Sequence, residues 1–389
     1  MTREEIREDI LNLKSNYILA ELPTSLGKSK IALDFMNEKA IEGRILIVIP
    51  RLVLINNWKA EFAKWHYTQY LPQVTFSTYV SLPKHVEEHY DLIIFDECHH
   101  LSERAQDAVL DILADYCILL SATVKKEFKQ ELVSLFPGIE MYKISMRKAI
   151  DESILPDPTV YLMPLKLDDT ANTQTIIINP KAPNYAGIIP YNKRFSARRD
   201  KNRKYIVQCT ELEYYQDLSS TVEYYKKVYF KTNNQIMYFK WQQKAKERLL
   251  WLASLKNNIV KKLLNELEDK RTLTFCSSIA QTEELGQYCI NSENPDSDKI
   301  LDAFNNKEIN HITACNILNE GANLTDCQVG IFVSINSSDI MTKQKNGRIL
   351  RHPKPIIYIP YYTNTREEEI VKNIVQNYNP DLITVIENL

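Results

Sequence analysis

The chain has 389 residues, which is long for one hydrophobic core and suits two domains. With 44% hydrophobic residues, 25% charged residues and a net charge of −2, it is an ordinary globular composition, which excludes a globally basic nucleic-acid binder. Its seven cysteines include no C-x-x-C pair, which argues against a zinc site or a disulfide framework, and no apolar run approaches membrane-spanning length. These features predict a cytoplasmic enzyme.

The segment Asn16–Met36 predicts a strand, a polar loop and a helix. An apolar run at 17–20 is typical of a buried strand, and later apolar residues recur at helical spacing, so LPTSLGKSK joins the two. Amides at a helix start, with the helix dipole behind them, suit nucleotide phosphates, which Lys28 would reach while Ser29 binds Mg²⁺. Leu22 stands where the strict pattern has glycine, so a structural turn with an incidental lysine is the alternative.

Two further apolar runs lead into polar residues. The run Arg44–Pro50 is followed by Arg51, and Phe76–Leu82 contains Thr78 and Ser81. Polar groups at the carboxyl ends of parallel strands are placed to contact a ligand, and these groups suit a phosphodiester backbone. An ordinary strand exit in the first case and a capped turn in the second are the alternatives.

The segment Asp91–His100 is an apolar strand that ends in two adjacent carboxylates. Asp96 would belong to the Mg²⁺ shell, and Glu97 would polarise the attacking water. Two unpaired carboxylates side by side repel one another, so this pattern is uncommon as a structural accident. His99 and His100 lack a third ligand at suitable spacing, which favours hydrogen bonding over zinc binding.

A further buried strand, Tyr116–Thr123, ends in hydroxyl residues. Because they follow a phosphate loop and a metal carboxylate, Ser121 and Thr123 suggest a switch that senses the γ-phosphate. Strands alternate with helices through residue 150, which predicts a doubly wound parallel sheet in a first α/β domain, 1–150.

Residues 151–270 differ from this domain, because six prolines punctuate β-type runs, and we expect them to form a central linker or insertion that packs with a second domain. The segment Lys193–Lys204 carries seven basic residues against one aspartate, so it is either a solvated loop or a nucleic-acid contact. The residues expected to make that contact are Arg198, Arg199, Lys201 and Arg203. The stretch Tyr214–Tyr238 offers stacking faces, although core packing is favoured, and Gln235–Asp269 predicts a long helical region broken near residues 257 and 258.

A second alternating series predicts a second domain, 271–389. Strands are expected at 272–276, 311–318, 329–334 and 356–360, with helices between them. Arg348 and Arg351 lie three apart, on one face if the segment is helical, and would reach a γ-phosphate across a cleft. A surface salt bridge is the more common fate of such arginines.

In this order, the segments resemble the superfamily 2 helicases of the DExH type across nearly the whole chain. The matching motifs are PTSLGKS (I), IPRLVLINNW (Ia), STYVSL (Ib), DECH (II), SAT (III), FCSS (IV), NEGANLTD (V) and QKNGRILR (VI). The resemblance implies two RecA-like domains that clamp ATP and Mg²⁺ between them and grip one nucleic-acid strand. LPTSLGKS with DECH is similar to UvsW-like phage recombination helicases, and the middle segment is similar to Swi/Snf-type translocases.

The resemblance also implies roles for single residues. The nucleotide would contact Pro23, Thr24, Ser25, Leu26, Gly27, Lys28, Ser29, Gly321 and Asn323. The domains would be coupled by His99 and Gln344, hydrolysis would be linked to strand movement by Ser121 and Thr123, and the arginine fingers would be Arg348 and Arg351. The nucleic acid would contact Arg51, Thr78 and Ser277.

The resemblance predicts a nucleic-acid-dependent ATPase that acts as a monomer on single-stranded or branched DNA, 3′ to 5′, in bacterial or phage replication or recombination. Other proteins of those processes would be its partners. An RNA helicase and a non-hydrolysing scaffold are the alternatives, and a restriction motor is less favoured because no nuclease-like segment remains. Family members usually read adenine with an upstream glutamine, whereas the first glutamine here is Gln69. Arg3, Arg7 or Asn12 would have to substitute, which predicts a relaxed base preference.

Overall fold

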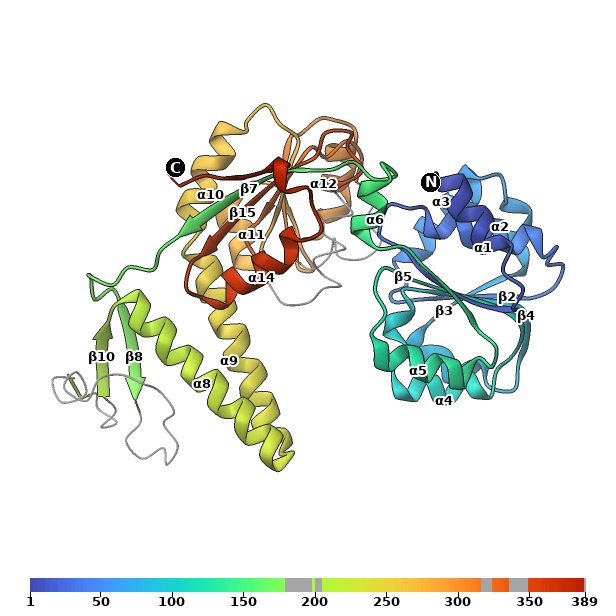
Figure 1. Ribbon diagram of the computed structural model, residues 1–389, viewed down its shortest axis with the longest axis horizontal. Helices are drawn as coiled ribbons and strands as arrows, with labels where there is room; N and C mark the ends of the chain where they lie inside the picture. Colours follow the sequence, from blue (N-terminus) through green and yellow to red (C-terminus); the bar gives the residue numbers. More distant parts are fainter. Residues whose placement is uncertain (179–197, 200–204, 316–323, 336–348, 388–389) are drawn as a thin grey trace.

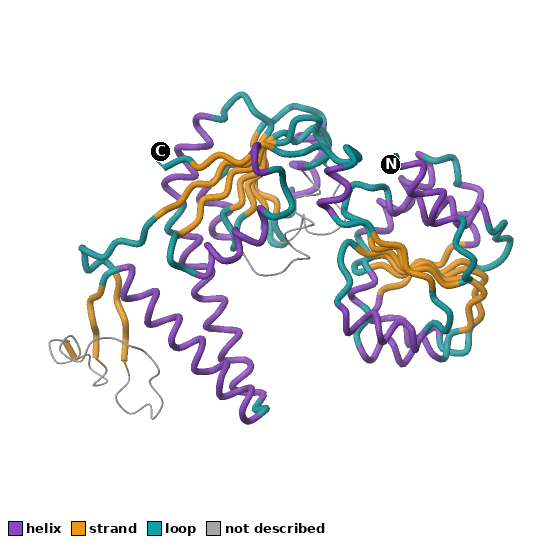
Figure 2. Tube along the Cα trace, viewed as in Figure 1, coloured by secondary structure: helices purple, strands orange, loops and turns teal. Residues whose placement is uncertain are grey.

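The protein consists of two α/β domains and a projecting helical hairpin, as the computed structural model shows (Figure 1). The structure describes residues 1–178, 205–315, 324–335 and 349–387, together with the backbone of 198–199. Each domain has a parallel sheet between helical layers, which confirms the predicted fold class (Figure 2). In the part of the chain that is described, no helix is both long and apolar enough to cross a membrane.

The first domain has a six-stranded parallel sheet in the order β3-β2-β4-β5-β1-β6. Its strands are β1 (Tyr17–Glu21), β2 (Ile45–Ile49), β3 (Val74–Thr78), β4 (His89–Asp96), β5 (Leu113–Ser121) and β6 (Glu140–Lys143). Its helices are α1 (Arg3–Leu11), α2 (Lys28–Glu38), α3 (Leu54–Lys64), α4 (Glu103–Leu110) and α5 (Lys126–Leu135), with 3₁₀ turns η1 (Thr68–Gln73), η2 (Tyr79–His85) and η3 (Cys98–His100). Helices α1 to α3 cover one face and α4 and α5 the other, so the strands are apolar on both sides. The strand predicted at 76–82 ends at Thr78, where η2 takes over.

The second domain has a seven-stranded parallel sheet in the order β12-β13-β11-β14-β15-β7-β16. Its strands are β7 (Thr159–Leu165), β11 (Thr272–Phe275), β12 (Cys289–Ile290), β13 (His311–Ala314), β14 (Val329–Phe332), β15 (Ile356–Tyr362) and β16 (Ile383–Val385). Its helices are α10 (Asn257–Glu266), α11 (Ile279–Leu285), α12 (Ser297–Asn305) and α14 (Arg366–Val375), with the turn η5 (Pro380–Leu382). The four predicted strands are confirmed, the one expected at 311–318 over its first four residues. Strand β7 pairs with β15 and β16, so the chain enters this sheet before it forms the hairpin.

Helix α6 (Met146–Asp151) lies between the two domains (Figure 1). Its Met146 and Ile150 are buried in a hydrophobic cluster that contains residues of both domains. Arg147 donates from Nη1 to the backbone oxygen of Tyr378 in the second domain, at 2.6 Å. The connection between the domains is therefore packed at this point.

The hairpin consists of α8 (Glu211–Thr232) and α9 (Gln235–Ser254), next to a small antiparallel sheet. The strands of that sheet are β8 (Gln174–Ile178), β9 (Arg198–Arg199) and β10 (Tyr205–Cys209). The break predicted near residues 257 and 258 is confirmed, because α9 ends at Ser254 and α10 begins at Asn257. Core packing of the tyrosine-rich stretch is wrong for most of it: Tyr215 is buried, whereas the other tyrosines of α8 and α9 are half-exposed. Among the described residues, the small sheet packs against the base of α8, and the outer half of the hairpin projects beyond it (Figure 1).

Replacing Glu21 with glutamine is expected to lower the free energy of unfolding at pH 7 by about 1–3 kcal/mol. Glu21 is buried at the end of β1 and accepts hydrogen bonds from Lys129 and from a neighbouring amide, with Lys143 at 3.1 Å. Burial alone would raise the pKa of Glu21, but the two lysines bring it below its ordinary value. The stabilisation is therefore present above about pH 4.5 and is lost as the pH falls through the lowered pKa.

Urea unfolding at pH 7 and at pH 4 checks this expectation. The difference between the wild type and Glu21→Gln should shrink at pH 4. Glu127→Gln, on the exposed side of α5, is the matched control and should change neither value. An equal difference at both pH values would contradict the role given to the ionised carboxylate.

Candidate nucleotide site

The loop between β1 and α2 has the backbone shape of a phosphate loop. Ser25 and Gly27 both adopt left-handed conformations, with φ of 76° and 79°. A residue with a Cβ pays a steric cost in that region, about 1 kcal/mol or more, so Ser25 is held there by its surroundings. Gly27 caps α2, and Lys28 is the first residue of that helix. The amides at the start of α2 therefore face the carboxyl end of the sheet, where an anion gains from the helix dipole.

Lys28 and Glu97 form an ion pair across this loop. The distance from Lys28 Nζ to Glu97 Oε1 is 2.8 Å, and the two side chains are only 10% and 13% exposed. Glu97 follows β4 in a left-handed conformation, with φ of 52°, which turns its side chain back toward the loop. Lys28 is thus neutralised by the carboxylate that would act on the attacking water, and a triphosphate would compete with Glu97 for it.

Asp96 is held by two aromatic side chains of neighbouring elements. Trp58 of α3 donates from Nε1 to Asp96 Oδ2 at 3.0 Å, and the Tyr79 hydroxyl donates to the Asp96 backbone oxygen at 2.7 Å. Burial and the adjacent Glu97 raise the pKa of Asp96 to about 6, while Lys28 and Trp58 act in the opposite direction. A carboxylate and the Ser29 hydroxyl are hard oxygen donors of the kind that Mg²⁺ prefers, so these residues fit that ion.

The ends of β4 and β5 are joined through His99 and Ser121. His99 Nδ1 lies 3.1 Å from Ser121 Oγ and 3.4 Å from Glu97 Oε2. Ser121 Oγ donates to the Thr123 backbone oxygen at 3.0 Å, and the Thr123 amide lies 3.3 Å from the same hydroxyl. The structure thus brings His99 into contact with both Glu97 and the last residue of β5. A movement of Glu97 would therefore change the surroundings of His99 and its contact with Ser121.

Arg351 of the second domain reaches the phosphate loop of the first. Its Nε donates to Ser25 Oγ at 3.4 Å, although the two residues are 326 positions apart in the chain. Partial burial lowers the pKa of Arg351, and Glu61 of α3 acts in the opposite direction. An arginine stays charged under any such shift. The guanidinium therefore faces the loop from the opposing domain.

Several predicted site residues lie outside the described residues. These are Gly321, Asn323, Gln344, Arg348, Lys201 and Arg203, while Arg198 and Arg199 are described only as the backbone of β9. Their roles stay predictions.

The residues predicted to contact nucleic acid follow the ends of three strands. Arg51 follows β2, Thr78 ends the adjacent β3, and Ser277 follows β11. Thr78 Oγ1 donates to Ser81 Oγ at 3.1 Å, and Ser277 Oγ donates to Gln281 Oε1 at 2.9 Å. At this point both a ligand contact and the simpler capped turn remain compatible with Thr78.

Sequence reasoning missed three exposed apolar side chains beside Arg51 and Thr78. Leu52, Val53 and Val80 are 63%, 64% and 88% exposed. They are apolar residues that closely follow β2 and β3 in the chain. The sequence pattern therefore does not distinguish them from the buried residues of those strands. They follow the carboxyl ends of the adjacent strands β2 and β3.

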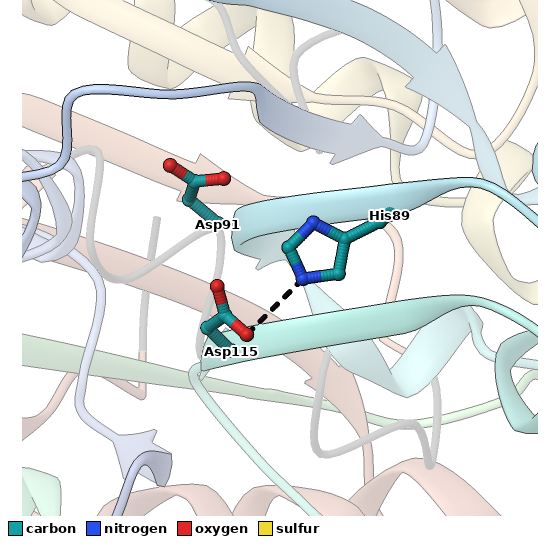
Figure 3. Close-up of side chains that lie close together, drawn as sticks. All are labelled: His89, Asp91 and Asp115. Atoms are coloured by element: carbon teal, nitrogen blue, oxygen red, sulfur yellow. Dashed lines mark hydrogen bonds and ion pairs between the residues drawn. The ribbon is translucent and has the colours of Figure 1, made fainter.

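A second group of titratable side chains lies at the other end of that sheet (Figure 3). His89 and Asp91 belong to the amino end of β4 and Asp115 to that of β5, with His89 Nε2 3.1 Å from Asp115 Oδ1. Their potential ligand atoms lie within 4.8 Å of one another, but His89 and Asp115 are exposed. Since β4 and β5 end at Asp96 and Ser121, this group is separate from the nucleotide site.

Trp58→Phe is expected to raise the Mg²⁺ concentration needed for half-maximal nucleotide hydrolysis by about tenfold, because outer partners of a metal ligand have effects of this size. Trp58 is buried and its indole orients Asp96, so phenylalanine keeps much of the packing and removes the donor. Titration of Mg²⁺ at saturating nucleotide measures the effect.

Trp65→Phe is the matched control, since Trp65 donates to Glu61 at 2.8 Å and not to Asp96. The same Mg²⁺ requirement in Trp58→Phe and the wild type would show that the indole does not position the carboxylate.

Comparison with known proteins agrees with this geometry. The family model described as "Type III restriction enzyme, res subunit" matches residues 3–126, and the model "Helicase conserved C-terminal domain" matches residues 255–353. The DNA 3'-5' translocase XPB2 of Sulfurisphaera tokodaii is 24% identical over 370 residues, which cover 87% of this chain and 76% of the relative.

Two solved structures show the same fold. The helicase domain of Pyrococcus furiosus Hef has a TM-score of 0.52 at 15% identity, covering 95% of this chain and 97% of the other. Dbp5 of S. cerevisiae, bound to RNA and ADP BeF3, has a TM-score of 0.61 at 10% identity, covering 98% and 89%. At these identities the likeness concerns the fold alone.

Proposed function

Because the chain is a helicase-type ATPase of superfamily 2, we propose that it uses ATP to translocate 3′ to 5′ on DNA and to unwind or remodel it. The observation that carries the proposal is the contact of Arg351 with Ser25, since a motor of this kind needs both domains at one triphosphate. The polarity and the DNA substrate are those in the name of the Sulfurisphaera tokodaii relative.

The proposed cycle begins when a triphosphate enters the loop. Lys28 leaves its ion pair with Glu97 and binds a phosphate instead, and Glu97 is then available to orient the attacking water. Asp96 and Ser29 would hold Mg²⁺, which neutralises phosphate charge when bound. Arg351 shifts from Ser25 onto the developing charge, which draws the domains together, and loss of the γ-phosphate removes that attraction.

The DNA path proposed here follows the carboxyl edges of both sheets. Arg51, Thr78 and Ser277 would contact the backbone, and the exposed Leu52, Val53 and Val80 would lie against bases or sugars. Gly321 and Asn323 would contact the nucleotide and Gln344 and Arg348 would complete the domain interface, as the family resemblance implies. The basic residues Arg198, Arg199, Lys201 and Arg203 would add phosphate contacts.

A role in replication or recombination, like that of UvsW-like helicases, and action as a monomer are parts of the same proposal. The second candidate is an RNA helicase. The observation that favours it is the similarity in fold to Dbp5, whose structure contains RNA. A scaffold that binds without hydrolysis is disfavoured by the ion pair of Lys28 and Glu97, because the two residues lie where a phosphate and an attacking water would bind.

The test compares ATP hydrolysis with single-stranded DNA, forked DNA and RNA of the same length. Displacement of streptavidin from biotin at either end of a single strand reports polarity. We expect stimulation by DNA and release from the 5′ end. Stimulation by RNA alone would favour the second candidate, and no hydrolysis with any polynucleotide would favour the scaffold.

Hydrolysis is also expected to have a relaxed base preference, with kcat/KM for GTP within about tenfold of that for ATP. Arg7 of α1 donates from Nη1 to Asp34 Oδ2 at 3.3 Å, beside α2, and a guanidinium has donors but no acceptor for the adenine amino group. Parallel assays with the two nucleotides measure the ratio. A strict requirement for ATP would contradict the expectation.

A further inference from the structure

The outer half of the α8–α9 hairpin is strongly basic. Residues 224–246, called the hairpin tip from here on, contain six lysines and neither aspartate nor glutamate. The first acidic residues on either side, Glu223 and Glu247, pair with Lys226 and Lys244 at 3.7 Å and 2.7 Å. A protein with a net charge of −2 thus concentrates positive charge on one projection.

The hairpin tip is built as a rigid turn. Asn233 ends α8 in a left-handed conformation, with φ of 50°, and its amide donates to the Tyr229 backbone oxygen at 2.7 Å. Asn234 caps the start of α9 and accepts from the amide of Ile236 at 2.8 Å. Asparagine tolerates both positions, because its short side chain bonds the nearby backbone. The two helices are therefore joined with little freedom.

Aromatic rings hold the two helices of the hairpin tip together. The ring of Tyr229 lies 5.2 Å from that of Tyr238 and 6.1 Å from that of Trp241, measured between centroids. These inner rings are half-buried, whereas Phe230 and Phe239 beside them are 69% and 68% exposed. Ile236 at the turn is 62% exposed. Large apolar side chains gathered on a rigid projection mark a binding surface.

The base of the hairpin is fixed to the second domain. Lys256, between α9 and α10, is fully buried and donates to Glu367 at 2.6 Å and to the Val333 backbone oxygen at 2.9 Å. Gln281 donates to the Ala253 backbone oxygen at 2.8 Å and accepts from Ser277, the predicted nucleic-acid contact. The hairpin tip therefore moves with the second sheet, and its base is linked to the proposed DNA path.

We propose that the hairpin tip binds unpaired bases of DNA, which stack on Phe230 and Phe239 while the lysines face the phosphates. This inference rests on the proposed function. Stacking needs exposed ring faces and tolerates any base, and a lysine-rich surface without carboxylates is complementary to a polyanion. Figure 1 shows the hairpin projecting below the second domain, and its base is linked through Gln281 to Ser277, so a strand bound at Ser277 would lie beside the root of the hairpin.

The experiment measures affinity for forked DNA by fluorescence anisotropy, with 2-aminopurine at the first unpaired position as a stacking reporter. Phe230→Leu/Phe239→Leu keeps apolar surface and removes both rings, and Phe230→Tyr/Phe239→Tyr keeps the rings. We expect the leucine variant to bind forked DNA at least fivefold more weakly with a changed 2-aminopurine signal, and the tyrosine variant to match the wild type. In Lys227→Gln/Lys231→Gln, the slope of log K against the logarithm of the salt concentration should be less steep by between about one and two.

Two controls separate this proposal from the function on which it rests. Leu110→Ala removes an apolar side chain of similar exposure, 63%, from the first domain and should change nothing. ATP hydrolysis stimulated by long single-stranded DNA should persist in the leucine variant, whereas its absence in the wild type would overturn the proposed function instead. Wild-type affinity in the leucine variant, or hairpin-dependent binding of anionic phosphatidylserine vesicles in place of DNA, would overturn the stacking site.

Discussion

Lys28→Ala is expected to lower kcat for ATP hydrolysis by at least a hundredfold, the size of effect seen when one preorganised charge-stabilising donor is removed. The Lys28 ammonium is buried enough for strong electrostatics and lies at the start of α2, where the phosphates would sit. Steady-state hydrolysis at saturating DNA and nucleotide measures the loss.

The same substitution leaves Glu97 beside Asp96 without its 2.8 Å partner, so the variant should also unfold at a lower temperature. Adding Glu97→Gln should restore thermal stability without restoring hydrolysis, because it removes the repulsion and also the group that orients water. Lys30→Ala is the matched control, since Lys30 pairs with Asp34 on the same helix. Normal turnover in Lys28→Ala would refute the nucleotide site.

Arg351→Ala is expected to lower kcat by about a thousandfold with little change in nucleotide affinity, which is the effect that the proposed arginine-finger role implies. Its contact with Ser25 at 3.4 Å brings the guanidinium to the loop, and the largest charge it would neutralise develops during hydrolysis. Binding of a fluorescent nucleotide and single-turnover hydrolysis separate the two effects.

Arg351→Lys should rescue only a small part of the activity, because an ammonium lacks the planar fork of donors. Arg366→Ala is the control, as Arg366 pairs with Glu369 on the exposed side of α14. If Arg351→Ala hydrolysed ATP at the wild-type rate, the second domain would have no part in the chemistry, and the proposed cycle would fail.

The local structure around the candidate site of the first domain followed from the sequence because it is short-range. Strand, loop and helix lie within twenty-one residues in Asn16–Met36, and Asp96 and Glu97 lie at the end of one apolar run. The sequence did not predict the hydrogen-bond partners of those residues. The donor from Trp58 to Asp96 joins α3 to β4, and an indole in an amphipathic helix has no pattern that distinguishes a hydrogen-bond donor from a packed ring.

The tyrosine-rich stretch 214–238 shows that composition did not predict burial. Its composition resembles that of a buried helix, which favours core packing, yet Tyr215 is the only one of its tyrosines that is buried. Burial depends on whether another layer covers the helix, and composition alone does not report that. The exposure of Phe230 and Phe239 follows from the hairpin standing away from both sheets.

The sequence by itself determined the alternation of strands and helices, the strand–loop–helix order around Lys28 and the position of Asp96 and Glu97 at the end of β4, since these depend on neighbours along the chain and on apolar periodicity. Tertiary structure alone decided that Arg351 contacts Ser25, that Lys28 forms an ion pair with Glu97, and that Phe230 and Phe239 of the hairpin are exposed to solvent. Such contacts join residues tens to hundreds of positions apart, and their free energy depends on distance in space, which no local pattern encodes.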